Sequence, residues 1–273
     1  MFRRPAAGNE DSTWPNRLIT ALNFQEYSAY YDLFYTDKNY ESEVGYVART
    51  LRGANPRTRT ILELGSGTGR HGRLLAGLGF DVHGVELSSD MASIARSSAG
   101  KTPGGGTFSC EVGDLRLARV RRTFDAVISL FHVISYQIAN DDLRAAFKTA
   151  AVHLEPGGAF FFDVWHGPAV LATPPSIRTK EVANQRYRVK RTARPEHDAD
   201  RATVRVVYEF DCQDLETGQK TQFIEEHLMR YLFPSEVELF AAEAGFTLLA
   251  TEEFLTSRPP SADTWGVGYL LQR

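Results

Sequence analysis

The sequence contains few cysteines and no large excess of charge of either sign. Its two cysteines, Cys110 and Cys212, lie far apart in 273 residues and have no metal-ligand spacing. This argues against a disulfide framework and a zinc site, so we expect two reduced, structural cysteines and no metal. The 31 basic and 34 acidic residues give a net charge of −3. We therefore expect no nucleic-acid partner, because no bulk electrostatic attraction is available.

Long apolar segments are also missing. No apolar run in the sequence approaches the ~18 residues that a membrane-spanning helix requires. The first residues, MFRRPAAG, lack the apolar centre of a signal peptide. We therefore expect a cytoplasmic location and no membrane contact. The chain length is suited to one α/β domain with a sizeable insertion, or to two small domains.

A glycine-rich turn between two apolar runs is the most informative feature that is present. The run 61–64 contains Glu63, and Gly65, Gly67 and Gly69 then follow at every second position. A helix-like segment comes next, and a second apolar run ends at Glu86. This order of strand, turn, helix and strand predicts the first unit of a doubly wound sheet. Glu86 would then offer two hydrogen-bond acceptors to the ribose of an adenosine cofactor.

Glu63 indicates which adenosine cofactor is bound. Dinucleotide sites place a pyrophosphate at a helix N-terminus, usually behind the spacing G-x-G-x-x-G. Here the spacing is G-x-G-x-G, and the Glu63 carboxylate lies two residues before the first glycine. A carboxylate at this place would repel a pyrophosphate, but it suits a ligand that carries an amino group and a sulfonium. We therefore predict S-adenosylmethionine (SAM), with an NAD(P)-dependent oxidoreductase as the alternative.

Two later strand ends carry further candidates. Asp114 follows an expected strand and can accept from the adenine amine, while the backbone N–H of Leu115 donates to a ring nitrogen; a capping role is the alternative for Asp114. The apolar run 124–130 is typical of a parallel strand that is covered on both faces. It leads into a loop with His132 and Tyr136, which we expect beside the methyl donor because ligands bind at the carboxyl ends of parallel strands.

With these motifs the chain resembles the class I SAM-dependent methyltransferases, whose first motif reads E/D-x-G-x-G-x-G. The resemblance covers residues 24–272 and is greatest to small-molecule N-methyltransferases, namely nucleotide-linked aminosugar N,N-dimethyltransferases and the glycine/sarcosine type. It implies an α/β fold with a doubly wound, mostly parallel seven-stranded sheet, the Rossmann-like methyltransferase fold. An N-terminal helical lid and an inserted antiparallel β meander would complete this fold.

The motifs and the resemblance together give a set of expected site residues. Those expected at the cofactor are Tyr31, Glu63, Gly65, Ser66, Gly67, Gly69, His71, Glu86, Leu87, Met91, Asp114, Leu115 and Phe131. Those expected at the acceptor are Tyr27, Tyr35, Asp163, Trp165 and His166. Tyr136 and His132 are the catalytic candidates, with Tyr136 expected to orient the acceptor rather than to act as a base. Met91 can equally belong to a helix core.

Three departures from the aminosugar enzymes bear on the acceptor. Tyr136 stands where those enzymes have a histidine, and Asp163 stands where they have a glutamate. The segment 258–265 lacks their glycine-rich Pro-Ser-Gly-Arg-Gly form. The sequence therefore favours a small-molecule amine as acceptor without identifying it as a sugar.

The expected organisation has four parts. Residues 1–16 form a flexible arm, and residues 17–56 form a tyrosine-rich helical lid. Residues 57–165 and 232–273 form the SAM-binding core, and residues 166–231 form an inserted substrate subdomain. Within this insertion we expect a loop over 166–180 and then three strands. The tyrosines of the lid have an alternative role as a static cap on the sheet.

The predicted function is direct SN2 transfer of a methyl group from SAM to a small-molecule acceptor, with an amine nitrogen favoured. O-methylation of a hydroxyl or phenol is the first alternative, because methyl transfer to oxygen gains more from a base. A non-catalytic SAM-binding module is the second alternative. The sequence leaves a homodimer open.

Overall fold

The computed structural model describes residues 28–273. The helices are α1 (Ser28–Phe34), α2 (Tyr40–Ala54), α3 (Arg70–Gly77), α4 (Ser89–Ser97), α5 (Asn140–Val152), α6 (Gly167–Ala172), α7 (Pro234–Glu243) and the short 3-10 helix η1 (Val133–Tyr136). One sheet contains β1 (Thr60–Leu64), β2 (Asp81–Glu86), β3 (Gly100–Lys101), β4 (Thr107–Val112), β5 (Phe124–Ser129), β6 (Leu154–Trp165), β11 (Thr247–Glu253) and β12 (Gly266–Gln272). A second sheet contains β7 (Arg178–Ala183), β8 (Tyr187–Asp198), β9 (Thr203–Asp214) and β10 (Lys220–Arg230).

The large sheet has the strand order β11-β12-β6-β5-β1-β2-β4-β3. Its five central strands, from β6 to β4, run parallel, while β12, β11 and β3 pair antiparallel at the two edges. The mostly parallel, doubly wound fold is confirmed. The expected count of seven strands was one too low, because β3 has only two residues and a strand of that length leaves no alternation in the sequence.

Helices cover both faces of the large sheet, and successive strand residues face opposite sides. Leu62, Val127 and Phe160 belong to the apolar core beneath α5 and α7. Their neighbours Ile61, Ala126 and Phe161 belong to the core beneath α2 and α3. Burial on both faces explains why β1 and β5 are continuous apolar runs. The order of the strands places the carboxyl ends of β1, β2 and β5 at one edge of the sheet. The topological switch point, between β1 and β5, lies beside the glycine turn.

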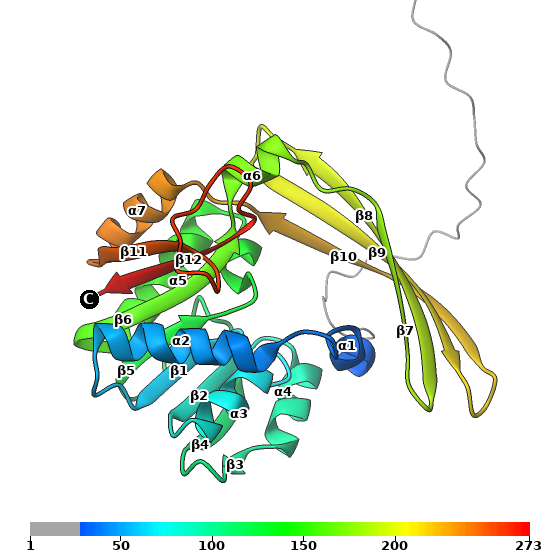
Figure 1. The fold of residues 1–273 in the computed structure, drawn as a ribbon, viewed down its shortest axis with the longest axis horizontal. Helices are drawn as coiled ribbons and strands as arrows, with labels where there is room; N and C mark the ends of the chain where they lie inside the picture. The colour runs from blue at the N-terminus through cyan, green and yellow to red at the C-terminus, as the bar shows by residue number, and fades with distance from the viewer. Residues whose placement is uncertain (1–27) are drawn as a thin grey trace, which may run out of the picture.

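The second sheet is antiparallel and extends away from the large sheet as a long curved arm (Figure 1). It contains four strands rather than the three expected, and a helix, α6, lies within the segment 166–180 that was expected to be a loop. The sequence gives little signal for β7, because Pro174 and Pro175 lie shortly before it and its residues are intermediate or exposed without apolar repetition. The next strand, β8, is long and continues to Asp198.

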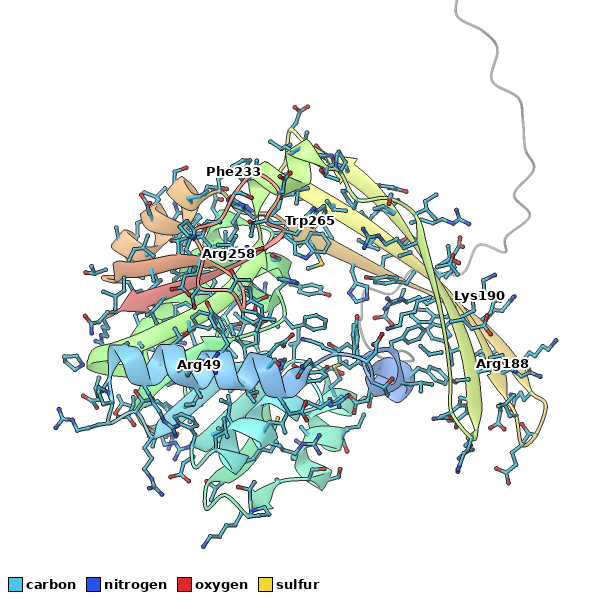
Figure 2. All side chains as sticks on the ribbon, in the orientation of Figure 1. Arg49, Arg188, Lys190, Phe233, Arg258 and Trp265 are labelled. Carbon is cyan, nitrogen blue, oxygen red and sulfur yellow. The ribbon has the colours of Figure 1, made fainter. Side chains whose placement is uncertain are left out.

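One face of this arm is solvated and the other is packed. Arg188 and Lys190 are exposed on either side of the fully buried Val189, and in Figure 2 they lie far out on the arm. This confirms that the basic stretch 186–194 is a strand with one solvated face. The packed face carries Phe210, which contacts Phe34 of α1 with ring centroids 5.9 Å apart. As a result α1 lies between the arm and the α/β core (Figure 1).

The N-terminal segment was expected to form a helical lid over residues 17–56. In the described part it forms two helices, α1 and α2, separated by a turn. Asn39 ends this turn, because its side chain accepts from the backbone N–H of Ser42 and so caps α2. The expected helix before residue 28, including Tyr27, lies outside the described residues. Among residues 28–273 no helix has the length and apolar character needed to cross a membrane.

Candidate cofactor and acceptor site

The glycine turn between β1 and α3 has an unusual backbone. Gly65, Gly67 and Gly69 all have positive φ, at 75°, 55° and 77°, a conformation that other residues rarely adopt. A Cβ on Gly65 would come within 2.4 Å of Val133, and one on Gly69 within 2.6 Å of Phe108. A Cβ on Gly67 would meet nothing within 4 Å. Gly65 and Gly69 are therefore required by packing, whereas Gly67 borders open space in which a ligand fits.

Glu86, at the end of β2, binds this turn through its carboxylate. Oε2 accepts from the Gly67 N–H at 2.8 Å, and Oε1 accepts from the Ser88 N–H at 2.8 Å. Each carboxylate oxygen can accept a second hydrogen bond. Burial raises the pKa of Glu86, although these backbone donors oppose the increase. A diol beside Gly67 would satisfy the remaining lone pairs, as the sequence predicted for a ribose.

Glu63 is a buried carboxylate beneath the same turn. Its side chain is 1% exposed, and Oε2 has no hydrogen-bond partner among the described residues. Burial, together with the nearby charge of Glu86, raises the pKa of Glu63 to about 8. The Oε2 atom, partnerless within residues 28–273, would gain from a cationic ligand, which would stabilise the ionised carboxylate, whereas a phosphate would oppose its ionisation, and an unsatisfied buried acceptor is costly. The observed environment therefore fits SAM better than a dinucleotide.

An ion cluster that sequence reasoning missed lies beside the turn. Glu43 Oε2 of α2 is 2.7 Å from Lys38 Nζ and 2.7 Å from His71 Nε2. Lys38 Nζ also lies 3.7 Å from the ring centroid of Phe131. Burial lowers the pKa of His71. At Glu43 burial would raise the pKa, but the neighbouring His71 and Lys38 outweigh it and hold the pKa below its ordinary value. The expected cofactor residue His71 is thus paired with the first turn of α2. The K-N-Y-E-S-E pattern gave no signal for this pairing.

The loop after β5 is held in a strained conformation. Phe131 and His132 both have positive φ, 65° and 62°, although neither is glycine. Asp163, at the end of β6, accepts from the Phe131 N–H at 2.7 Å and from the His132 N–H at 3.2 Å. Its Oδ2 also lies 2.7 Å from His132 Nδ1. Burial would raise the pKa of Asp163, but the His132 charge and these hydrogen bonds hold it below its ordinary value.

These contacts join Asp163 to the loop after β5. The sequence placed Asp163 and Trp165 at the acceptor, and both stay predictions there. In the structure Asp163 is 1% exposed and its carboxylate is engaged by the loop, so it positions that loop. The Trp165 ring lies 6.2 Å from the His132 ring and 5.8 Å from the Trp265 ring. The loop, β6 and the segment before β12 therefore meet at one place.

Tyr136 meets the inner face of the arm. Its hydroxyl is 2.7 Å from Nδ1 of His227, and Nε2 of His227 is 2.9 Å from Oε1 of Glu225. The Tyr208 ring lies 5.0 Å from the His227 ring. Burial raises the pKa of Tyr136 well above its ordinary value, and the neighbouring Tyr208 adds to the increase. Sequence reasoning missed Glu225 and His227 as a pair with Tyr136, because 91 residues separate the hydroxyl from its partner.

The expected adenine side is formed by the ends of β2 and β4. Leu87 is 67% exposed, and Met91 is 2% exposed on α4. Leu115, which follows β4, is also buried. Asp114 is held by Arg116, whose Nη2 lies 2.6 Å from Oδ2, and this hydrogen bond lowers the pKa of Asp114. The adenine roles of these four residues stay predictions.

The lid contributes an aromatic row that reaches the loop. The Tyr31 and Tyr35 rings are 4.8 Å apart, and the Tyr35 ring lies 5.1 Å from that of Phe131. Asp32 between them accepts from the Thr68 hydroxyl of the glycine turn at 2.9 Å. The structure thus brings Tyr31, Tyr35 and Phe131 together.

Two expected residues have other partners. Ser66 is buried, and its Oγ lies 3.4 Å from Sγ of Cys110. His166 is also buried, with Nδ1 3.2 Å from the Thr264 carbonyl oxygen, and burial lowers its pKa. Cys110 and Cys212 are both buried, and they form no disulfide within residues 28–273.

Sequence comparisons match the central part of the chain. Residues 61–158 match the methyltransferase domain family. Over 144 residues the chain is 35% identical to the dTDP-3-amino-3,4,6-trideoxy-alpha-D-glucopyranose N,N-dimethyltransferase of Streptomyces venezuelae, covering 52% of this chain and 58% of that protein. It is 32% identical over 145 residues to the dTDP-3-amino-3,6-dideoxy-alpha-D-glucopyranose N,N-dimethyltransferase of Streptomyces fradiae, covering 52% of this chain and 54% of that one. The chain thus spans little more than half the length of these relatives.

Solved structures match over much more of the chain. Streptomyces venezuelae DesVI is similar with a TM-score of 0.73 and 26% identity, over 89% of this chain and 97% of that one. The SAM-bound amino pentose methyltransferase of Micromonospora echinaspora is similar with a TM-score of 0.70 and 26% identity, over 93% of this chain and 99% of that one. Together these matches show that residues 61–158 belong to the methyltransferase domain family and that the chain has the fold of solved SAM-dependent methyltransferases.

Proposed function

We propose that this protein transfers the methyl group of SAM to the amino group of a nucleotide-linked aminosugar. The observation that carries the cofactor half is the pair of buried carboxylates at the glycine turn, one of them with an oxygen that has no partner among residues 28–273. The acceptor half is supported by the relatives, which are named as dTDP-aminosugar N,N-dimethyltransferases. Dimethylation of one amine is therefore part of the proposal.

The chain's own residues fit SAM in three places. Glu86 would accept from the ribose hydroxyls, because each of its oxygens has used one hydrogen bond on the backbone. Glu63 would face the cationic part of the cofactor. Lys38 would attract the methionine carboxylate, since its ammonium lies over Phe131. Phe131 and His132 form the loop after β5, which we call the methyl-donor loop. All three assignments follow from charge and donor–acceptor matching.

The reaction needs positioning more than acid–base chemistry. SAM supplies an electrophilic methyl on a sulfonium, so an amine lone pair forms the N–C bond while the S–C electron pair stays on sulfur. The loop at Phe131 and His132, fixed by Asp163, would bring the acceptor into line with the methyl. The packed lid and arm would exclude water from the reacting atoms. An amine supplies its own lone pair, whereas a hydroxyl acceptor needs a base.

We also propose roles for three of the four expected parts of the chain. Residues 17–56 would act as the lid, residues 166–231 as the acceptor-binding subdomain, and residues 57–165 and 232–273 as the core. The contacts of Tyr35 with Phe131 and of Tyr136 with His227 support these roles, because each joins two of the parts. A cytoplasmic location and action without a nucleic-acid partner belong to the same proposal. The near-neutral net charge of −3 supports the absence of nucleic acid.

The test is a turnover assay with a matched pair of acceptors. The purified chain would be incubated with SAM and a dTDP-3-amino-3,6-dideoxyglucose, and the products would be weighed by mass spectrometry. We expect the mass of one and then two methylene groups to be added. The dTDP-sugar that carries a hydroxyl at the same carbon should remain unmodified. Methylation of the hydroxyl sugar alone would favour the O-methyltransferase, and binding of SAM without any product would favour the non-catalytic module.

A further inference from the structure

Three polar side chains, two of them buried, form a row that ends on η1, directly after the loop at Phe131 and His132. Tyr136 lies on η1 of the core, and His227 and Glu225 lie two residues apart on β10 of the arm. The Tyr136 hydroxyl is 2.7 Å from His227 Nδ1, and Nε2 of the same ring is 2.9 Å from Glu225 Oε1. His227 is 2% exposed and Glu225 is 8% exposed. The row therefore bridges the two sheets through a contact that is shielded from water.

The row has a defined hydrogen-bond direction. A carboxylate oxygen at 2.9 Å from a ring nitrogen cannot face a lone pair there without strong repulsion, so Nε2 of His227 carries the hydrogen. The approach of the carboxylate to this N–H is bent, and its effect on the ring is therefore mainly that of its charge. In the neutral ring Nδ1 is then an acceptor. The Tyr136 hydroxyl must donate to Nδ1, which leaves the lone pairs of the phenol oxygen to accept from another group.

Tyr136 also belongs to an element that borders the proposed site. It is the last residue of η1, which directly follows His132. Val133, the first residue of η1, packs on the glycine turn, since a Cβ on Gly65 would come within 2.4 Å of it. Tyr136 thus joins the arm, through its hydroxyl, to an element that packs on the glycine turn.

We propose that Glu225 and His227 are positioning residues that fix the Tyr136 hydroxyl as a hydrogen-bond acceptor for the amine of the methyl acceptor. This inference rests on the proposed function. An amine N–H that donates to Tyr136 has its lone pair directed elsewhere, and a fixed acceptor oxygen selects one direction for that lone pair. Tyr136 would contact the acceptor, while His227 and Glu225 would act through it.

The same row can remove the proton that each methylation produces. When the amine nitrogen gains a methyl it becomes an ammonium, which must lose a proton before a second transfer. That proton would pass to the Tyr136 oxygen as the phenol proton passes to His227 Nδ1. The resulting imidazolium is stabilised by the Glu225 carboxylate and later releases its proton to water. Tyr136 never becomes a phenolate, which agrees with its raised pKa.

The first experiment measures the His227 ring directly, without any acceptor. Protein labelled with ¹⁵N-histidine would be studied by NMR with S-adenosylhomocysteine bound, and the His227 signals would be assigned by their loss in His227→Gln. We expect the neutral ring with the hydrogen on Nε2 and a hydrogen-bonded, unprotonated Nδ1. In Tyr136→Phe the tautomer should persist and the Nδ1 shift should move to that of a free acceptor. A hydrogen on Nδ1, in the neutral or the charged ring, overturns the proposal.

The second experiment is a double-mutant cycle on turnover of the dTDP-aminosugar. Glu225→Gln keeps the shape of the side chain but accommodates either His227 tautomer. We expect Glu225→Gln and Tyr136→Phe each to lower kcat by about 10- to 100-fold, the effect of one oriented hydrogen bond, with little change in KM. The double variant should be no slower than Tyr136→Phe alone, because the carboxylate acts through the phenol. Multiplied effects in the double variant overturn the proposal.

A matched control pair lies on the same sheet. Nε2 of His197 on β8 is 3.0 Å from the hydroxyl of Tyr231, the residue that follows β10. His197→Gln should leave kcat and the His227 signals unchanged. If the wild-type chain does not methylate the aminosugar while His227 has the expected tautomer, the amine acceptor fails but the polarity of Tyr136 stands. If turnover occurs with the opposite tautomer, the proposed function stands and this inference fails.

Discussion

At the scale of single residues, the sequence predicted the groups whose partners lie nearby in the chain. Glu63, Gly67 and Glu86 belong to one strand–turn–helix–strand unit, so their spacing alone placed them at a common edge. The Lys38–Glu43–His71 cluster and the Tyr136–His227 pair could not be predicted, because each joins elements that only the tertiary fold brings together. No periodicity records such a pairing.

Glu63 predicts a pH dependence of stability. Its pKa in the folded protein is about 8, above the ordinary value of 4.5, so the fold favours the neutral form. The contribution of Glu63 to stability is therefore fully present below about pH 4.5 and is lost as the pH rises through about 8. Glu63→Gln stays neutral throughout, so its free energy of unfolding should fall less steeply than that of the wild type over this range. Urea unfolding without cofactor would measure both slopes.

The expected difference in slope is at most about 1.4 kcal/mol per pH unit, the value for one proton. Glu86 also has a raised pKa, but it is present in both proteins and cancels in the comparison. Glu238→Gln is the matched control, because that side chain is exposed on α7 and forms no ion pair within residues 28–273. Glu111, 52% exposed on β4, is unsuitable here because it pairs at 3.6 Å with His83, which itself titrates. Parallel pH profiles for the wild type and Glu63→Gln would contradict the assignment.

Glu86 predicts the strength of cofactor binding. Glu86→Ala removes both acceptors for the ribose, and a hydrogen bond to a charged group contributes about 1.5–3 kcal/mol. Calorimetry should therefore show S-adenosylhomocysteine affinity reduced at least tenfold. Glu111→Ala should bind as the wild type does. An unchanged affinity of Glu86→Ala for S-adenosylhomocysteine would show that the ribose does not bind to this carboxylate.

At the scale of elements, most strands and helices of the core were predictable and the loop after β5 was not. The buried strands are apolar runs between turns, which the sequence displays directly. By contrast, Phe131 and His132 adopt positive φ although neither is glycine, so the sequence gives no sign of it. The cause is Asp163 on another strand, whose carboxylate accepts hydrogen bonds from both backbone N–H groups. Tertiary contacts here override local preference.

Asp163→Asn tests this account of the loop. An amide can accept from only one of the two N–H groups through its oxygen, so one buried donor loses its partner at a cost of about 1–3 kcal/mol. We expect lower stability in urea and a clear loss of turnover, because the methyl-donor loop is displaced. Asp125→Asn is the control, since Asp125 also accepts from two backbone N–H groups, of Arg59 and Thr60, but through the single oxygen Oδ2, which an amide oxygen can replace. It lies at the opposite end of β5 and should keep both its stability and its binding of S-adenosylhomocysteine. Equal turnover of the two variants would show that the loop does not depend on Asp163.

At the scale of the whole molecule, the arm was foreseen as a meander, but its extent and its partner were not. Exposed strand faces carry mixed polar residues, so β7 and the last residues of β8, 195–198, resemble loops in sequence. The inner face of the arm packs against helix α1. Phe34 contacts Phe210, and Lys180 of β7 donates to the Phe34 carbonyl at 2.7 Å. The lid and the arm therefore form one packed unit beside the core.

This arrangement predicts that cofactor binding stabilises α1. Asp32 of α1 accepts from Thr68 of the glycine turn, and Tyr35 reaches Phe131, so a ligand at the turn gains contacts only when α1 is docked. Hydrogen exchange in peptides covering 28–39 should slow when S-adenosylhomocysteine is added, while peptides covering α7 should not change. Asp32→Ala removes the contact with the turn and should reduce this protection. Asp37→Ala is the matched control, because Asp37 pairs with Lys180 at 2.8 Å and lies away from the turn at 71% exposure. Equal exchange of α1 with and without ligand would instead assign the tyrosines a static role, as a cap on the sheet.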